Sequence, residues 1–501
     1  MRLHDCSVSR LKRMSHKRKI ICFGAGERLQ QMFCSLSDLN IQDNIAFIVD
    51  NDRSKWGLYR NINGKDVVIK SPDVLKEIKE DKYIILITAW RYNEIFAQIQ
   101  NLSGTRNFFV IKNITGRYHI VRFIENILKR FPLRGSIVFQ GEGDTCENAV
   151  ALAKYLKEEG YLKKNTIYWL CNHPEKYKNS YREKYVLRDT DFLKTSIGKQ
   201  ILYIIALSTS RYLIFENQMI KKRREDQISI YLNHGSPPLK ATKGIINLPS
   251  NLNYAVCPSV NCADILCEQY GINKERLLYC GSPRTDILFD QMIKSSLAEL
   301  LHITNYRKVV LWVPTFRQHF KNGRVDTKRQ YKSGMPIVET EKDWSGLIDF
   351  LKKRSILLII KPHLLQKIDL LKIPQNINVN FITQTDLEKL HSNVYDLMKL
   401  CDGMITDYST IAFDYMLLDR PIGYTIDDIK EYKVGFSVSD PLALMPGEKI
   451  TNLMEFILYL ENIYCEKDTY AKERAAISDY IHGQFCDGNN SKRLANLVNL
   501  K

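Results

Sequence analysis

The sequence predicts an α/β protein of about three domains, built on parallel, doubly wound sheets. Short apolar runs of strand length recur along the 501 residues, and amphipathic segments of helical length separate them. Several of these runs lead into loops rich in Gly, Pro, Ser or basic residues, and ligands bind at such loops in open sheets of this class. A prior of about 150 residues per domain gives three domains for this length.

The composition is that of a globular protein without membrane spans. Apolar residues make up 45% of the chain and charged residues 26%. The longest apolar runs, such as Ile201–Leu207, are far shorter than the roughly 20 residues that a span needs. The basic N-terminus is not followed by an apolar stretch of the signal-peptide type. We therefore expect a cytoplasmic protein.

The charge favours polyanionic partners. The formal net charge is +17, from 73 Lys and Arg against 56 Asp and Glu. The basic residues are spread out, and we find no nucleic-acid-binding motif, so we expect a phosphate-rich substrate or an anionic membrane surface and no nucleic acid. The twelve cysteines follow neither a disulfide framework nor a zinc pattern, which indicates buried free thiols.

Residues 17–115 are expected to form a small Rossmann-like module. KIICFGAGERLQQMF predicts a strand, a Gly-x-Gly turn and a helix, and IAFIVDND predicts a second strand that ends in Asp50. Gly24, Gly26 and Asp50 are a possible nucleotide site, although Leu29 stands in place of the third glycine of the fingerprint. An unused nucleotide fold is an equal alternative. The module resembles those appended to bacterial polysaccharide-biosynthesis enzymes, and this resemblance names no ligand.

Two segments are expected to lie outside the domains. Residues 1–16 are predicted to be a basic, poorly ordered leader. Residues 116–134 are a basic amphipathic segment, for which we prefer a linker helix to membrane attachment.

Residues 135–265 repeat the alternation of strand and helix, with strands in SIVFQG, TIYWLC, RYLIFEN and ISIYLN. The last strand leads into the peptide HGSPPLK, which begins at His234. A lone His in a loop is usually structural, but the Gly and two Pro fix this one at the carboxyl edge of a sheet, where ligands bind. We therefore treat His234 as a candidate functional residue.

Residues 266–501 are expected to form the third domain, in which four strands each lead into a polar loop. The loops carry Gly281, Pro283, Arg284 and Asp286; Pro314, Thr315 and Arg317; Lys361, Pro362 and His363; and Ser409 and Thr410. Because cationic and hydroxyl-bearing loops gather at one edge of one sheet, they predict an anion pocket.

The fourth loop belongs to the segment Cys401–Pro421. A strand at Gly403–Thr406 and a helix at Thr410–Leu418 are predicted, with hydroxyls at the helix start that suit a phosphate. Alone, the segment fits an ordinary strand–helix turn better, and the other three loops favour the phosphate. The nearby Asp427-Asp428 pair is expected to be solvated and not to bind Mg²⁺.

The motifs HGSPPLK, GSPRTDIL, VPTFR, IIKPH and ITDYSTIAFDYMLLDRPIGY, in this order and spacing, resemble the CDP-glycerol glycerophosphotransferase family of teichoic acid and capsule synthesis. DDIKEYKVGFSVSD is similar to the acidic-aromatic segment of that family. The chain departs from the family pattern at Ser236, Pro238, Phe316 and Thr410 and around His363. These changes leave the phosphate chemistry intact and the polyol open.

The resemblance implies a GT-B architecture, in which two Rossmann-like domains face each other across a cleft. The enzyme would transfer a polyol phosphate, glycerol phosphate first of all, from a CDP-polyol to an acceptor hydroxyl and release CMP. It implies a lipid-linked or oligosaccharide acceptor and a peripheral position on the inner face of the membrane. The donor contacts would be His234, Gly235, Ser236, Pro237, Pro238, Arg284, Pro314, Thr315, Arg317, Lys361, Pro362, His363, Ser409, Thr410 and Asp414.

His234 and His363 are the candidate catalytic residues. We predict that His234 is the general base, because its domain would face the acceptor, and that His363, close to Lys361, contacts the donor phosphate. Cationic side chains and a helix N-terminus can stabilise the pyrophosphate, so we expect neither a metal nor a cofactor. A CDP-ribitol donor, a GT-B glycosyltransferase that uses a nucleotide sugar and a non-catalytic scaffold remain as alternatives.

Overall fold

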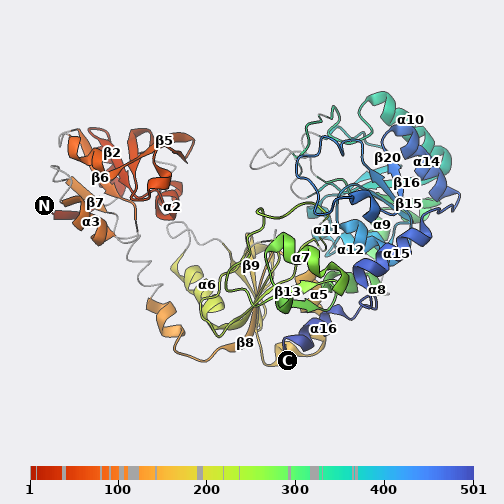
Figure 1. Cartoon of the computed structure of the whole chain (residues 1–501), viewed down its shortest axis with the longest axis horizontal. Coiled ribbons are helices and arrows are strands. Elements are labelled where there is room, and N and C mark those ends of the chain that lie inside the picture. Colours follow the sequence, from red (N-terminus) through yellow and green to blue (C-terminus); the bar gives the residue numbers. More distant parts are fainter. Residues whose placement is uncertain are drawn as a thin grey trace. The chain divides into compact units, whose positions relative to one another are not determined.

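The computed structural model describes residues 2–6, 8–35, 41–78, 82–89, 92–100, 107–110, 123–141, 144–188, 196–217, 219–235, 237, 239–290, 295–315, 326–329, 331–363, 366 and 371–500. The chain divides into two compact units (Figure 1). The first comprises Met1–Leu133 with Asn172–Tyr177 and Tyr185–Thr209. The second comprises Arg134–Cys171, Lys178–Lys184 and Ser210–Lys501.

The first sheet forms the N-terminal module and has the strand order β1-β7-β6-β2-β3-β5-β4. Its pairs are parallel except for the β4–β5 hairpin, which is antiparallel. Apolar side chains cover both of its faces, as two separate core clusters. The elements are β1 (Arg2–Asp5), α1 (Val8–Ser15), β2 (Lys19–Phe23), α2 (Glu27–Ser35), β3 (Ile45–Val49), β4 (Tyr59–Ile62), β5 (Lys65–Lys70), β6 (Tyr83–Ile87), α3 (Tyr92–Gln100) and β7 (Asn107–Val110).

The expectation of a poorly ordered leader is wrong, because β1 and α1, at Arg2–Asp5 and Val8–Ser15, belong to this module. β1 pairs in parallel with β7 at the edge of the sheet. Cys6 and Leu11, at 1% and 0% exposure, are buried in the module core. The basic residues of α1 hide this pattern in the sequence, since a four-residue strand and a two-turn helix are too short to show a period of their own.

The second sheet has the order β10-β9-β8-β11-β12-β13-β14. The pairs from β9 to β14 along this order are parallel, as the repeated strand–helix pattern predicts. Its strands are β8 (Arg134–Gln140), β9 (Ile167–Cys171), β10 (Glu183–Leu187), β11 (Ser210–Phe215), β12 (Ile228–Tyr231), β13 (Tyr254–Cys257) and β14 (Leu277–Tyr279). The helices of this region are α5 (Glu147–Glu158), α6 (Ile197–Thr209) and α7 (Ala263–Tyr270).

The predicted domain boundary at residue 265 is also wrong, because β14 belongs to the second sheet. β14 pairs in parallel with β13. The GSPRTD motif that follows β14 therefore lies at the edge of the second sheet, and only three of the four predicted loops belong to the third. Of the predicted linker helix, residues 123–128 are helical and residues 116–122 lie outside the described residues, and β8 begins at Arg134.

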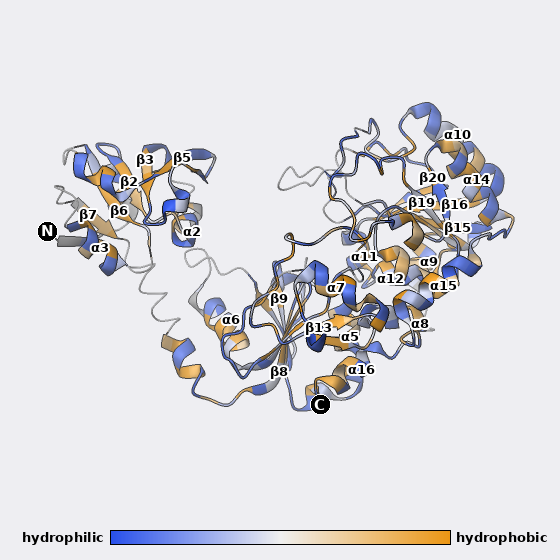
Figure 2. Cartoon of the chain, in the orientation of Figure 1, coloured by the Kyte–Doolittle hydropathy of each residue, from blue (hydrophilic) through white to orange (hydrophobic). Residues whose placement is uncertain are grey.

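The third sheet has the order β17-β16-β15-β18-β19-β20, with parallel pairs throughout. Figure 2 shows its central strands as hydrophobic and its covering helices as two-sided. The strands are β15 (Lys308–Trp312), β16 (Ile356–Ile360), β17 (Val379–Phe381), β18 (Gly403–Thr406), β19 (Ile422–Thr425) and β20 (Glu448–Ile450). The helices of this part are α8 (Asp286–Phe289), α9 (Ser295–Leu300), α10 (Glu341–Arg354), α11 (Gln384–Lys389), α12 (Val394–Lys399), α13 (Ile411–Tyr415), α14 (Leu453–Tyr464), α15 (Ala471–His482) and α16 (Asn490–Leu497).

Helix α10 shows how local sequence fixes an element of this sheet. A capping box between Thr340 and Asp343 satisfies the first backbone N–H groups of the helix. Trp344, Leu347 and Leu351 then recur at helical spacing and are buried against the third sheet, in a cluster shared with α14. Burying three such side chains stabilises the packing by several kcal/mol, at about 1.5–3 kcal/mol each.

The C-terminal helix α16 returns to the side of the second sheet. The Tyr212 hydroxyl on β11 donates to the carbonyl oxygens of Val498 and Asn499, at 3.1 and 2.9 Å. The Asp286 carboxylate accepts the backbone N–H groups of Asn490 and Ser491, at 2.8 and 2.7 Å. Asp286 therefore holds the start of α16. No helix in the described part of the chain has the length and apolar character needed to cross a membrane.

Candidate active site

A cavity of about 200 Å³ lies within the second unit, where loops from the second and third sheets meet. His234 follows β12 of the second sheet, and the loops after β15, β16 and β18 of the third sheet supply most of the other walls. The side chains that line it are those of Thr145, Cys146, Glu147, Asn217, His234, Arg284, Val313, Pro314, Thr315, Lys361, Pro362, His363, Gln384, Glu388, Val394, Tyr395, Ser409, Thr410, Ile411 and Asp414.

The cavity brings together most of the residues proposed from the motifs. Ten of them line it: His234, Arg284, Pro314, Thr315, Lys361, Pro362, His363, Ser409, Thr410 and Asp414. Gly235 and Pro237 belong to the same loop as His234 but are not among the lining residues. Ser236, Pro238 and Arg317 lie outside the described residues.

The residues on either side of His234, Asn233 and Gly235, fix the loop that carries it. Asn233 takes a left-handed conformation, with φ of 61°, and its side-chain oxygen accepts a hydrogen bond from the Tyr270 hydroxyl at 3.0 Å. A Cβ atom on Gly235 would lie 2.9 Å from Oγ1 of Thr410. Glycine therefore allows the His234 loop to approach the start of α13 closely.

His234 faces a buried carboxylate. Its Nδ1 atom lies 3.4 Å from Oε2 of Glu216, the residue that follows β11. The Glu216 side chain is 2% exposed, whereas the His234 side chain is 51% exposed. Desolvation alone would lower the pKa of His234, but the Glu216 carboxylate outweighs it, so the pKa is raised. For Glu216, desolvation opposes the charged form, and the His234 ring outweighs it and lowers the pKa.

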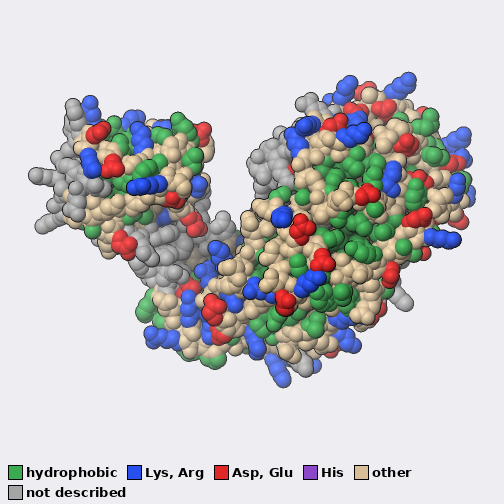
Figure 3. All heavy atoms as spheres, in the orientation of Figure 1, with side chains coloured by type: hydrophobic (Ala, Val, Ile, Leu, Met, Phe, Trp, Pro, Cys, Tyr) green, Lys and Arg blue, Asp and Glu red, His purple; other side chains and the backbone are tan. Residues whose placement is uncertain are grey.

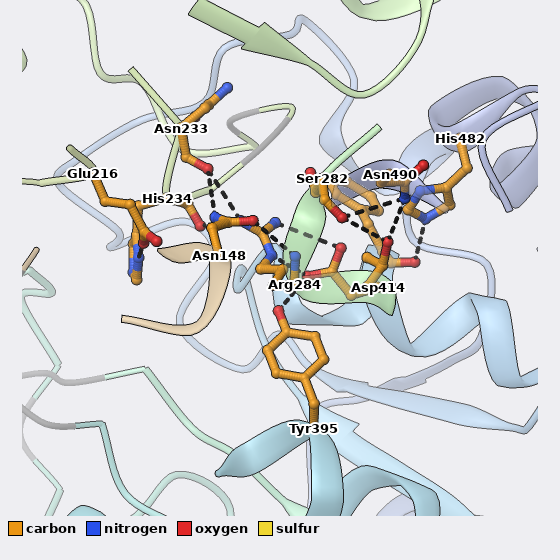
Figure 4. Close-up of polar contacts among 12 residues, drawn as sticks. Asn148, Glu216, Asn233, His234, Ser282, Arg284, Tyr395, Asp414, His482 and Asn490 are labelled. Atoms are coloured by element: carbon orange, nitrogen blue, oxygen red, sulfur yellow. Dashed lines mark hydrogen bonds and ion pairs between the residues drawn. The ribbon is translucent and has the colours of Figure 1, made fainter. Parts of the chain in front are cut away.

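Arg284 and Asp414 form a buried ion pair across the site (Figure 4). Nε of Arg284 donates to Oδ2 of Asp414 at 2.8 Å, and both side chains are at most 4% exposed. Desolvation would lower the pKa of Arg284, but the Asp414 carboxylate raises it. Nη1 of Arg284 donates to the carbonyl oxygens of Asn233 and His234, at 3.1 and 2.8 Å. Because Arg284 follows β14, this pair joins the second sheet to the third.

The opposite wall of the cavity carries a cation and hydroxyl groups. Burial lowers the pKa of the Lys361 amine, against the opposing effect of the Glu147 and Glu388 carboxylates. Helix α13 begins at Ile411, and Thr410 precedes it without a side-chain capping bond. The Thr410 hydroxyl therefore does not cap the helix.

The sequence missed several acidic and aromatic groups at this site. Glu147 begins α5, Glu388 lies on α11, and Tyr395 on α12 donates its hydroxyl to Oδ2 of Asp414 at 2.6 Å. These helices are unremarkable in sequence. Glu216 is different: the predicted strand RYLIFEN included it, but β11 ends at Phe215, so Glu216 lies at a strand end, as His234 does.

The structure also shows the surroundings of the acidic residues Asp427, Asp428 and Asp50. Asp428 is buried and the Asp427 side chain is 1% exposed, so the pair is not solvated; Tyr331 and Tyr408 donate their hydroxyls to these carboxylates at 2.9 Å each. Asp50 lines a cavity of about 210 Å³ in the N-terminal module with Gly24 and Gly26. Its carboxylate accepts the backbone N–H groups of Ala25 and Asp52, at 2.6 and 2.9 Å, and so fixes the glycine loop. A nucleotide at this cavity stays a prediction.

The described residues also show the state of the cysteines and of possible metal ligands. Eight of the described cysteines are buried and form no disulfide, while Cys465 and Cys486 are exposed. Among the described residues, no three His, Cys, Asp or Glu side chains gather closely enough to hold a metal ion.

The fold and the cavity define a GT-B-like transferase site at the facing edges of two parallel sheets. The chain matches the CDP-Glycerol:Poly(glycerophosphate) glycerophosphotransferase family over residues 127–500 and belongs to it. It is therefore an enzyme that transfers a polyol phosphate from a CDP-polyol, as the enzymes of teichoic acid synthesis do.

Individual relatives agree with this assignment. The chain is 22% identical to the teichoic acid ribitol-phosphate polymerase TarK of Staphylococcus aureus, over 75% of this chain and 71% of that one. It is 24% identical to the teichoic acid glycerol-phosphate primase of Bacillus subtilis, over 58% of this chain and 72% of the primase. The solved structure of the wall teichoic acid polymerase TagF shares the fold, with a TM-score of 0.61 at 18% identity, covering 82% of this chain and 96% of TagF.

Proposed function

We propose that this enzyme transfers glycerol phosphate from CDP-glycerol to an acceptor hydroxyl, with His234 as the general base. The observation that carries the proposal is the His234 ring, which is half exposed at the cavity while its Nδ1 atom faces the buried Glu216 carboxylate. The other ring nitrogen, Nε2, is then left to accept a proton. Both glycerol-phosphate and ribitol-phosphate enzymes occur among the relatives, and the family match favours glycerol.

The reaction joins the acceptor oxygen to the β-phosphorus of the donor. As that bond forms, the bond from the β-phosphorus to the bridging oxygen breaks, and the oxygen leaves with CMP. The hydroxyl proton passes to Nε2 of His234, which is a role worth a factor of about 10²–10⁴ in rate. Lys361, His363 and the hydroxyls of Ser409 and Thr410 would hold the pyrophosphate, which a cation and hydrogen-bond donors can stabilise.

A donor screen tests this function. The protein is incubated with CDP-glycerol, CDP-ribitol and UDP-sugars in the presence of a teichoic acid primer, and released CMP and UDP are measured with and without EDTA. We expect CMP from CDP-glycerol, at a rate that EDTA does not change. UDP release would favour a GT-B glycosyltransferase, and strict dependence on added Mg²⁺ or Mn²⁺ would contradict the metal-independent mechanism.

The two histidines should differ in their effect on turnover and binding. His234→Ala should lower kcat by about 10²-fold or more, since a lost general base has this magnitude, with a modest change in donor affinity. His363→Ala should mainly raise the Kd for CDP-glycerol. Steady-state kinetics and calorimetry separate the two effects, and the reverse result would exchange the two roles.

We further propose that the enzyme acts on a lipid-linked acceptor at the inner face of the membrane. The net charge of +17 supports attraction to anionic lipid. Apolar side chains exposed near the helical residues 123–128 support contact with the lipid itself. Phe123, Ile127 and Phe131 are 66%, 39% and 59% exposed; Phe123 and Ile127, four positions apart, lie along one side of the helical residues, and Phe131 follows them.

A further inference from the structure

We propose that Glu216 is a positioning residue for His234, which fixes the proton on Nδ1 and stabilises the imidazolium that forms during transfer. This inference rests on the proposed function, because it gives a partner to the proposed base. No sequence motif assigns this role to Glu216. The contact between the side chains of Glu216 and His234 is what indicates it.

The geometry fits a hydrogen bond that orients the ring. Nδ1 of His234 donates toward Oε2 of Glu216 across 3.4 Å. The backbone N–H of Glu216 donates to the carbonyl oxygen of Gln140 at 3.0 Å, so the carboxylate projects from a fixed point at the edge of the second sheet. The carbonyl oxygen of His234 is itself held by Arg284. Both ends of the contact are therefore anchored.

The burial of Glu216 argues against an incidental contact. A carboxylate with a 2% exposed side chain has lost its hydration, which costs several kcal/mol unless an ionic partner compensates. Within the described part of the chain, its one ion-pair partner is His234. The Cys146 thiol lies against the same carboxylate and lowers its pKa further. The fold thus keeps a charged side chain at a buried position beside His234.

Some charged groups around the pair raise the pKa of His234 and others lower it. Glu147 at the start of α5 raises the pKa of His234, as Glu216 does, and Arg284 lowers it. Burial raises the pKa of Tyr231 on β12 and of Cys146, and the Glu216 carboxylate adds to both shifts, so both groups stay neutral. Because Glu216 makes the largest of the contributions that favour the charged ring, its removal should lower the pKa of His234.

The sign of the pH effect follows from the role of the base. A general base works when neutral, so kcat rises with pH through the pKa of the enzyme–substrate complex. Removing the Glu216 charge lowers that pKa and moves the acid limb of the kcat profile to lower pH. The tautomer and orientation of the ring are lost as well, so the plateau value of kcat should fall about tenfold or more. A residue that only supported the fold would lower stability and leave the limb in place.

The test compares Glu216→Gln, Glu216→Asp and the wild type as full-length enzymes. For Glu216→Gln we expect a kcat that is about tenfold lower or more, a KM for CDP-glycerol within threefold, and an acid limb at lower pH. Glu216→Asp, which keeps the charge, should recover part of kcat and restore the limb. Glu183→Gln is a matched control, because Glu183 pairs with Lys157 and Trp169 and does not line the cavity. An unmoved limb in Glu216→Gln overturns the proposal.

A second measurement does not depend on turnover. The His Cε1 resonance of His234, assigned by its loss in His234→Asn, reports the ring pKa by NMR. It should titrate at lower pH in Glu216→Gln than in the wild type, and an unchanged titration overturns the pairing. If the wild type releases no CMP from any CDP-polyol, the proposed function fails, yet this resonance still decides for or against the contact between Glu216 and His234.

Discussion

At the scale of single residues, two side chains predicted to bind the donor are found to bind each other. Arg284 follows β14 of the second sheet, and Asp414 lies on α13, which follows β18 of the third. The two side chains form a buried ion pair. Tyr395 adds a third contact to Asp414. The motifs GSPRTD and ITDYSTIAFD therefore contact each other through this ion pair. The contact has a structural role, because Arg284 also holds the carbonyl oxygen of His234.

This pair should contribute strongly to stability when only one partner is removed. Asp414→Asn leaves the Arg284 charge buried without its counter-ion, and breaking a buried pair in this way costs about 3–5 kcal/mol. Urea unfolding followed by tryptophan fluorescence should show this loss. The double replacement Arg284→Met with Asp414→Leu should be less destabilised than either single change.

A surface pair provides the control for this comparison. Lys274 and Asp264 are 56% and 84% exposed, so Asp264→Asn should leave the unfolding midpoint unchanged. A single change at Asp414 that is as mild as the one at Asp264 would contradict a structural role for the buried pair.

At the scale of elements, the strand β18 and the helix α13 present two hydroxyls to the cavity. Ser409 and Thr410 follow Asp407, whose carboxylate accepts the backbone N–H and the hydroxyl of Thr315, each at 2.9 Å. The loops after β15 and β18 are thereby tied together. Because Thr410 makes no capping bond, its hydroxyl is available for a ligand in this part of the structure.

Replacement of both hydroxyls should weaken donor binding without unfolding the protein. Ser409→Ala with Thr410→Ala removes two hydrogen bonds to a charged phosphate, each worth about 1.5–3 kcal/mol. The Kd for CDP-glycerol, measured by calorimetry, should therefore rise about tenfold or more. Thr340→Ala removes the cap of α10 far from the cavity and should change stability but not affinity. Equal donor affinity in the double variant would move the phosphate site elsewhere.

The sequence predicted the long, buried elements and the loops that follow them. Runs such as ILLII and YIILI are apolar throughout because their strands are buried on both faces, and this makes β16 and β6 recognisable. Short edge strands such as β1 and β20 lack that signal. Sheet membership was also hidden, since a three-residue strand such as β14 carries no mark of the sheet that it joins.

The candidate site was predictable for a similar reason and to a similar extent. Loop residues after strands, such as His234 and Lys361, follow from the chain order alone. Glu147, Glu388 and Tyr395 come from helices that approach the cavity from a distance in sequence, and only the folded packing brings them there. The partner of Arg284 was out of reach as well, because Asp414 lies 130 positions further along the chain.

At the scale of the whole molecule, the distribution of charge bears on the proposed association with a membrane. Figure 3 shows Lys and Arg side chains scattered among acidic ones over the visible face of the molecule. A net charge of +17 gives general attraction to an anionic surface. A defined contact would need apolar groups as well, and Phe123, Ile127 and Phe131 are among the exposed apolar side chains of the first unit.

The last prediction follows from combining these two contributions. Binding to vesicles of anionic phospholipid should be tight at low salt and fall steeply as salt is added, since each Lys or Arg near the surface contributes about 1 kcal/mol that salt screens. Phe123→Ser with Phe131→Ser should weaken co-sedimentation at every salt concentration, because apolar insertion is not screened. Met454→Ser on α14, which removes another exposed apolar side chain at 77% exposure, should have no effect. Equal binding to neutral and anionic vesicles would exclude the electrostatic contribution, and unchanged binding of the double Phe variant would place the lipid contact away from this segment.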